Sequence, residues 1–208
     1  MAFTANTFFE LVVSNSPRDE KQNVAGYYGT VSDGVLTGVD CSAGQLAVRN
    51  KLAPLEGYAG AKDYQGNTVS ISNGNTWYFT EATSGSVTGR PGDETGIYAC
   101  NTHDVQNVGG YNIGAKTLGL GIPAGERGNF TELRVGDQIC VGSGNLTTAV
   151  STNGYATVSA HGLLTPAASA PTDGSVYFIL RRTKPINEGT SFFGTGYVYE
   201  VARSVASA

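Results

Sequence analysis

Charged residues and histidine are scarce in this sequence. Charged side chains make up 14% of its 208 residues, well below the roughly 25% of an average soluble domain. The 13 Lys and Arg against 17 Asp and Glu give a formal net charge of −4, and no basic cluster is longer than Arg181-Arg182. This composition excludes charge-patterned coiled coils and helical bundles, and it argues against a nucleic-acid partner.

Long apolar runs are also missing, since no segment approaches the about 18 apolar residues of a membrane-spanning helix. The first residues, Met1 to Asn6, lack the positive and apolar regions of a signal peptide. The sequence therefore predicts a chain that stays in the cytoplasm of the cell that makes it and does not enter a membrane. In that compartment Cys41, Cys100 and Cys140 are expected to be free thiols.

Glycine is abundant, with 29 residues, about double the usual share. Four dipeptides separate short runs rich in Val, Ile, Thr and aromatic residues: Asp33-Gly34, Asn73-Gly74, Gly136-Asp137 and Asn153-Gly154. Such pairs supply the positive φ that two-residue hairpin turns need. Further strands are predicted within residues 96–100, 175–181 and 196–201. The pattern predicts an all-β fold, an antiparallel β-sandwich or barrel built of short hairpins.

The first dozen residues form an apolar N-terminal arm that carries Phe3, Phe8, Phe9 and Leu11. Left in water, these side chains would promote aggregation, so the arm needs a surface to dock on. It either adds an edge strand to its own sheet or reaches a neighbouring protein. The four side chains are therefore candidate partner contacts.

Composition also predicts how the chain is divided. Residues 14–23 are polar and hold a cluster of charges, as linkers do. We expect residues 1–25 to be arm and linker and residues 26–208 to be the β domain, with a division into two subdomains near residues 58–66.

The Asn73-Gly74 turn predicts which neighbouring side chains share a face. In a hairpin with a two-residue loop, Val69 and Ile71 line one face while Trp77 and Phe79 line the other. Both faces then carry large apolar groups. Either the strand pair is covered on both sides within the domain, or Trp77 or Phe79 packs on another subunit, which makes both of them candidate partner contacts.

The sequence contains few residue patterns that are typical of catalytic or metal-binding sites. The only histidines are His103 and His161, and no cysteine spacing is that of a zinc site. Cys100 and His103 would point to opposite faces of a strand, which does not suit a nucleophile and its base. Residues 119–125 are Gly-rich, but Pro123 interrupts them and no βαβ pattern surrounds them, as a dinucleotide loop would require. We expect no catalytic residues, no metal and no cofactor, and hence no enzyme.

The second half of the chain resembles known proteins in the order of its short sequence segments. The segments that carry the resemblance are residues 116–128, Gly136-Asp137, residues 141–146, residues 162–167 and the Tyr-rich stretch 196–201. Together they resemble virion structural proteins of tailed bacteriophages, and most of all the small head decoration (cement) proteins. The resemblance covers roughly residues 110–203 and rests on no diagnostic motif.

The resemblance implies a non-enzymatic β protein that binds the outside of the assembled major capsid lattice and stabilises it. The partners would be the major capsid protein of the same virus and other copies of this chain, trimers being common in that class. The chain would be made in the host bacterial cytoplasm and end on the surface of the virion head. The alternative is a tail, fibre or other virion protein with a carbohydrate- or host-receptor-binding β module.

Overall fold

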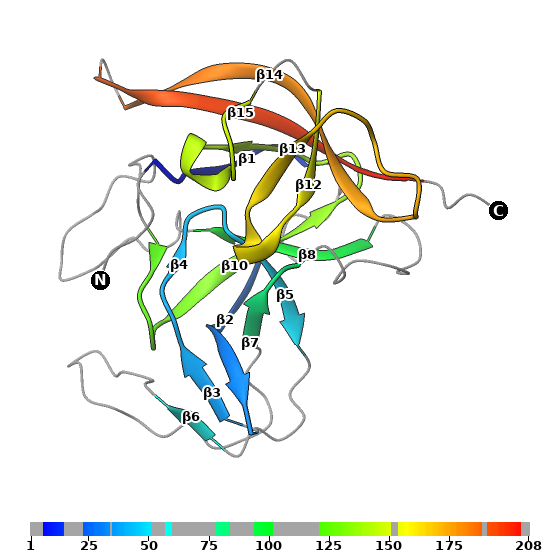
Figure 1. The fold of residues 1–208 in the computed structure, drawn as a ribbon. Helices are drawn as coiled ribbons and strands as arrows, with labels where there is room; N and C mark the ends of the chain where they lie inside the picture. Colours follow the sequence, from blue (N-terminus) through cyan, green and yellow to red (C-terminus); the bar gives the residue numbers. More distant parts are fainter. Residues whose placement is uncertain are drawn as a thin grey trace.

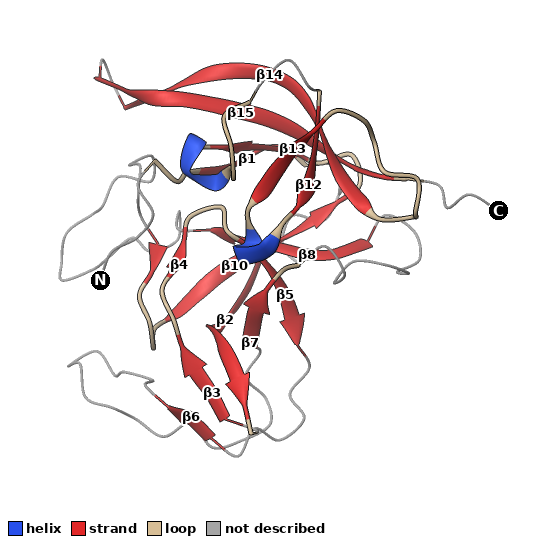
Figure 2. Ribbon diagram, in the orientation of Figure 1, coloured by secondary structure: helices blue, strands red, loops and turns tan. Residues whose placement is uncertain are grey.

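The computed structural model describes residues 6–14, 23–33, 35–50, 57–59, 78–83, 94–101, 121–150, 154–188 and 191–204. Most of these residues lie in strands, and the two helical segments are single 3-10 turns, η2 (Ser143–Asn145) and η3 (Ala160–Gly162) (Figure 2). The all-β prediction is confirmed. In the described part of the chain, no helix is long and apolar enough to cross a membrane.

Fifteen strands lie in the described residues (Figure 1). In chain order they are β1 (Phe9–Val13), β2 (Asn23–Ser32), β3 (Val35–Gly38), β4 (Cys41–Ser42), β5 (Leu46–Asn50), β6 (Gly57–Ala59), β7 (Tyr78–Glu81), β8 (Glu94–Asn101), β9 (Gly121–Ile122), β10 (Arg127–Arg134), β11 (Gln138–Val141), β12 (Tyr155–Val158), β13 (Leu164–Ala167), β14 (Val176–Glu188) and β15 (Ser191–Arg203).

Six strands form an antiparallel sheet in the order β1-β11-β15-β14-β12-β13, which lies in the upper part of Figure 1. Side chains alternate between its two faces, as the pleat of a strand requires. In β12, for example, Ala156 and Val158 are buried while Tyr155 and Thr157 are half-buried. One face is therefore part of the core and the other is not.

A second group of strands closes on itself. The strands β10, β8, β5, β7 and β2 pair in that order, and β10 also pairs with β2, so five strands form a ring. The β2–β7 pair is parallel and the other pairs of the ring are antiparallel. Closure removes the exposed edges of these five strands. Beyond the ring, β3 and β6 continue the sheet towards the bottom of Figure 1.

Aromatic rings fill the interior of this small barrel. The ring of Phe79 stacks on that of Phe130 at a centroid distance of 3.9 Å and meets the ring of Tyr98 edge-on at 5.3 Å. The main core lies between the barrel and the six-stranded sheet, with side chains such as Ile97 and Leu133 from the barrel and Phe178 from the sheet. Barrel and sheet are thus held together by one shared apolar layer.

The Asp33-Gly34 hairpin is confirmed. Ser32 at the end of β2 pairs with Val35 at the start of β3, and Asp33 has a φ of 50°. A short Asp side chain tolerates this left-handed conformation, which the turn requires. The Asn73-Gly74 turn lies outside the described residues.

Two other predicted hairpins are wrong. Gly136-Asp137 joins β10 to β11, but β10 belongs to the barrel and β11 to the six-stranded sheet. The turn is held instead by β15, since Gly136 N–H donates to the Val201 carbonyl and Val201 N–H donates to the Asp137 carbonyl. After Asn153-Gly154, β12 pairs with β13 and β14, so both of its edges are taken and the described residues 148–150 do not pair with it.

The predicted division of the chain also needs correction. β1 pairs with β11, so the arm is part of the six-stranded sheet and not a separate unit. β2 begins at Asn23, which places the predicted boundary at residue 25 inside a strand. β5 pairs with β7 and β8, so strands from both sides of residues 58–66 share the barrel and no subdomain boundary falls there.

Candidate functional site

The structure buries three of the six side chains that the sequence assigned to a partner. Phe8 and Phe9 are 3% and 2% exposed, and Phe79 is fully buried in the barrel. Leu11 is half-buried and packs against the main core. These side chains are covered by the chain itself, and their assignment as partner contacts stays a prediction. Phe3 and Trp77 lie outside the described residues.

Asn145 explains why the arm joins its own sheet. Its side chain is 1% exposed, and its Oδ1 accepts hydrogen bonds from the backbone N–H of Phe8 at 2.9 Å and of Gly142 at 3.1 Å. Its Nδ2 donates to the Ala43 carbonyl at 2.7 Å. One amide therefore connects the arm, the turn before β5 and its own 3-10 turn.

The outer face of the six-stranded sheet is partly covered and partly open. Near the arm, the bent hairpin of β14 and β15 lays Ile186 over Phe8, Cys140 and Val198, and these four side chains are buried. The Nζ of Lys184 pairs there with the Glu10 carboxylate at 2.5 Å. This half of the face is closed by the chain itself.

The other half is a surface to which every strand of the sheet contributes. The paired outward residues form a row across the six strands: Val13, Gln138, Glu200, Ile179, Tyr155 and Ala167. Each is half-buried except Val13, which is 46% exposed and is one of two exposed large apolar side chains in the described part of the chain. We call this row, together with the outward side chains of Tyr177 and Arg181, the open face.

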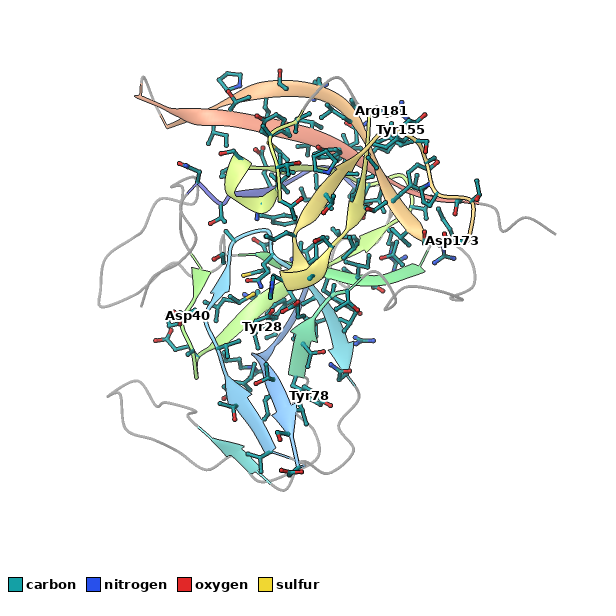
Figure 3. All side chains as sticks on the ribbon, in the orientation of Figure 1. Tyr28, Asp40, Tyr78, Tyr155, Asp173 and Arg181 are labelled. Carbon is teal, nitrogen blue, oxygen red and sulfur yellow. The ribbon has the colours of Figure 1, made fainter. Side chains whose placement is uncertain are left out.

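Two tyrosines and an ion pair give the open face its chemistry, and Figure 3 labels one residue of each, Tyr155 and Arg181. The rings of Tyr155 and Tyr177, from adjacent strands, are 6.1 Å apart at an angle of 49°. Arg181 lies at a bulge of β14 and donates from Nε and Nη2 to both carboxylate oxygens of Glu200, each at 2.9 Å. These hydrogen bonds lower the pKa of Glu200 and raise the pKa of Arg181. The two charges compensate each other.

This arrangement suits recognition. Tyrosine and arginine are enriched where proteins bind one another. Tyrosine offers a large contact area with two rotatable bonds, and arginine offers several hydrogen-bond donors. A sheet holds such side chains at fixed spacing, which reduces the entropy lost on binding. The fork-shaped Arg181–Glu200 pair is also held in place before any partner arrives.

Sequence reasoning missed the open face although a signal was present. The segment 175–181 was recognised as a strand, and its alternation already separates Val176 and Phe178 from Tyr177 and Arg181. The sequence does not show which face of a strand is covered. That depends on strands far away in the chain.

The polar groups around η3 are held by structural contacts. Gln45 donates to the Tyr28 hydroxyl and to the His161 carbonyl, each at 3.0 Å, while the Glu81 carboxylate accepts from the His161 backbone N–H. Burial raises the pKa of Tyr28. These contacts fasten η3 to the barrel. His103 lies outside the described residues.

The three cysteines are free and buried, as predicted. Burial raises the pKa of Cys41 well above its ordinary value and that of Cys140 to about 11. A buried thiol that keeps its proton is a small apolar side chain. Within the described residues, no group of three or more His, Cys, Asp or Glu side chains is placed to hold a metal ion.

No protein-family model, no curated protein and no solved structure matches this chain. The open face and the fold that presents it are therefore the basis for a functional proposal.

Proposed function

We propose that this chain is a bacteriophage capsid decoration protein that binds the outside of the assembled major capsid lattice and stabilises it without catalysing a reaction. It would be made in the host cytoplasm and end on the surface of the virion head. The observation that carries the proposal is the open face, a sheet surface with two tyrosines and an arginine that the chain itself leaves at least partly exposed.

Charge supports the same function. Many copies held side by side on a lattice repel one another if each carries a large net charge. Here the formal charge is only −4 for 208 residues, and the ion pair on the open face compensates itself. Neighbouring copies can therefore be packed closely at a small electrostatic cost.

The test is co-sedimentation of the purified chain with empty heads assembled from a single capsid protein. The wild-type chain should saturate the heads. The double variant Tyr177→Ala and Arg181→Ala should bind about 10- to 100-fold more weakly, as expected when two interface anchors are removed.

Thr37→Ala is the matched control. Thr37 is an exposed residue of β3, which lies at the opposite end of the molecule in Figure 1. It should bind like the wild type, and all variants should melt near the wild-type temperature. Equal binding of the double variant would exclude the open face as the contact, and a wild-type chain that stays in the supernatant would refute the decoration function.

The hairpin of β14 and β15 favours a second candidate, a tail or fibre protein with a receptor-binding surface. Its two strands have 13 residues each, and it extends beyond the neighbouring strands of the sheet (Figure 1). Ile186 holds the bend of this hairpin against Phe8, and the paired ends of β14 and β15 beyond it form a short projection for contact with a neighbouring subunit. In this candidate, Tyr155 and Tyr177 would stack on a sugar of the host surface. Binding to host polysaccharide without binding to heads would favour it.

A further inference from the structure

A strand ladder, backbone hydrogen bonds and apolar packing from residues far away in the sequence hold the N-terminal arm. The ladder of β1 is made with β11, from Phe9 opposite Val141 to Val13 opposite Gln138. The backbone of the arm is bound by Asn145 and by Gly144, whose N–H donates to the Asn6 carbonyl at 3.0 Å. We call the residues that bind the arm the acceptor. None of these contacts requires that the arm and the acceptor belong to the same copy of the chain.

The acceptor is shaped closely around the arm. A Cβ placed on Gly44 would lie 2.6 Å from the Phe8 carbonyl oxygen, and one placed on Gly142 would lie 2.1 Å from the Asn6 carbonyl oxygen. Phe8 is buried among Cys140, Ile186 and Val198 on one face of the sheet, and Phe9 is buried in the main core on the other. An empty acceptor would expose apolar surface on both faces, so it is stable only when an arm fills it.

We propose that copies of this chain exchange their arms, residues 6–14, so that at high local concentration the arm of one copy is β1 of its neighbour. The contacts are identical in both arrangements, and their free energies therefore cancel. The ratio of exchanged to unexchanged arms then depends on two quantities, the effective concentration of a chain's own arm and the concentration of neighbouring copies. Residues 15–22 connect the arm to β2 and span at most about 29 Å, so the donor must be an adjacent copy.

The proposal concerns the chain alone and does not depend on attachment to a capsid. It names the arm of a second copy as the occupant of the acceptor because the side chains of the arm are already fitted to it. A crowded array of copies is the state in which exchange becomes frequent.

A cross-link to native Cys140 tests the exchange directly. Glu10 pairs with Cys140 across the β1–β11 ladder, and opposed residues of antiparallel strands have the Cα separation of a disulfide. The full-length Glu10→Cys variant is equilibrated from micromolar to millimolar concentration, oxidised with diamide, and run on a non-reducing denaturing gel. We expect covalent dimers and higher species whose share rises with concentration and levels off in the millimolar range, where short linkers place their effective concentration.

Two variants serve as controls. Glu10→Ser keeps Cys140 without a partner, and Glu10→Cys combined with Cys140→Ser removes the acceptor thiol; neither should give the cross-linked ladder. A bridge that stays within the monomer at every concentration overturns the proposal.

The wild-type chain gives a second measurement without any substitution. A fluorescent peptide of residues 1–14, mixed in excess with the full-length chain, should replace the resident arm and migrate with the chain on gel filtration. A peptide that carries Phe8→Ala and Phe9→Ala competes with an intact resident arm and should be retained at least about tenfold less, the change expected for a loss of about 1.4 kcal/mol. Absence of peptide binding to the wild-type chain at millimolar concentration also overturns the proposal.

Discussion

Replacing Asn145 by Ala should cost far more stability than an ordinary polar substitution. The change removes a fully buried amide that accepts two backbone hydrogen bonds and donates a third, to residues in three different segments. Leaving a buried donor or acceptor without that partner costs about 1–3 kcal/mol per group. Three such groups, partly compensated by relaxation, give an expected loss of about 3–5 kcal/mol in the free energy of unfolding.

Urea denaturation followed by circular dichroism measures this loss, and limited proteolysis reports whether the arm is released first. Asn50→Ala is a matched control, because its partly buried Nδ2 donates to Thr80 Oγ1 at 2.7 Å and to the Val48 carbonyl at 3.3 Å. That control should lose about 0.5–1.5 kcal/mol. If Asn145→Ala lowers the free energy of unfolding no more than Asn50→Ala does, the three hydrogen bonds of Asn145 do not connect the arm to the rest of the chain as the geometry indicates.

Three further outcomes follow from burial. Deleting residues 1–14 removes the buried Phe8 and Phe9 and the β1 strand, and at about 2–4 °C per kcal/mol it should lower the melting temperature by about 10–20 °C in scanning calorimetry. Tyr199→Phe should unfold at an equal or higher urea concentration, because the buried Tyr199 hydroxyl has no hydrogen-bond partner in the described part of the chain. Burial raises the pKa of Cys140 to about 11 and that of Tyr199 to about 12. As the pH rises, the unfolded chain therefore loses these protons before the folded chain does. The free energy of unfolding keeps its full value below about pH 9 and falls as the pH rises towards 11–12. Urea midpoints between pH 8 and 11 should show the fall, and Cys140→Ala should reduce it.

Local patterns in the sequence were sufficient to predict the fold class. Alternating Val, Ile, Thr and aromatic residues predicted the strands β8, β14 and β15, and Asp33-Gly34 predicted the hairpin of β2 and β3. These predictions succeeded because strand propensity and turn conformation depend on residues that are neighbours in the chain.

The pairing of strands was beyond local reasoning. Gly136-Asp137 reverses the chain, yet the strand that follows it pairs with β1 and β15 and not with the strand before it. A turn dipeptide sets the direction of the backbone over two residues. The choice of partner depends on which apolar faces can be buried together, and those faces come from distant segments.

The arm and the open face show the same division between sequence and tertiary structure. The sequence alone established that Phe8 and Phe9 must be covered, because exposed aromatic side chains are unfavourable in water. It did not establish what covers them. Asn145, Ile186 and the β11 edge do so, and the chain brings them to the arm only when the six-stranded sheet is complete. The same sheet leaves Tyr155 and Tyr177 half-exposed, since burial is a property of the assembled layers and not of any single strand.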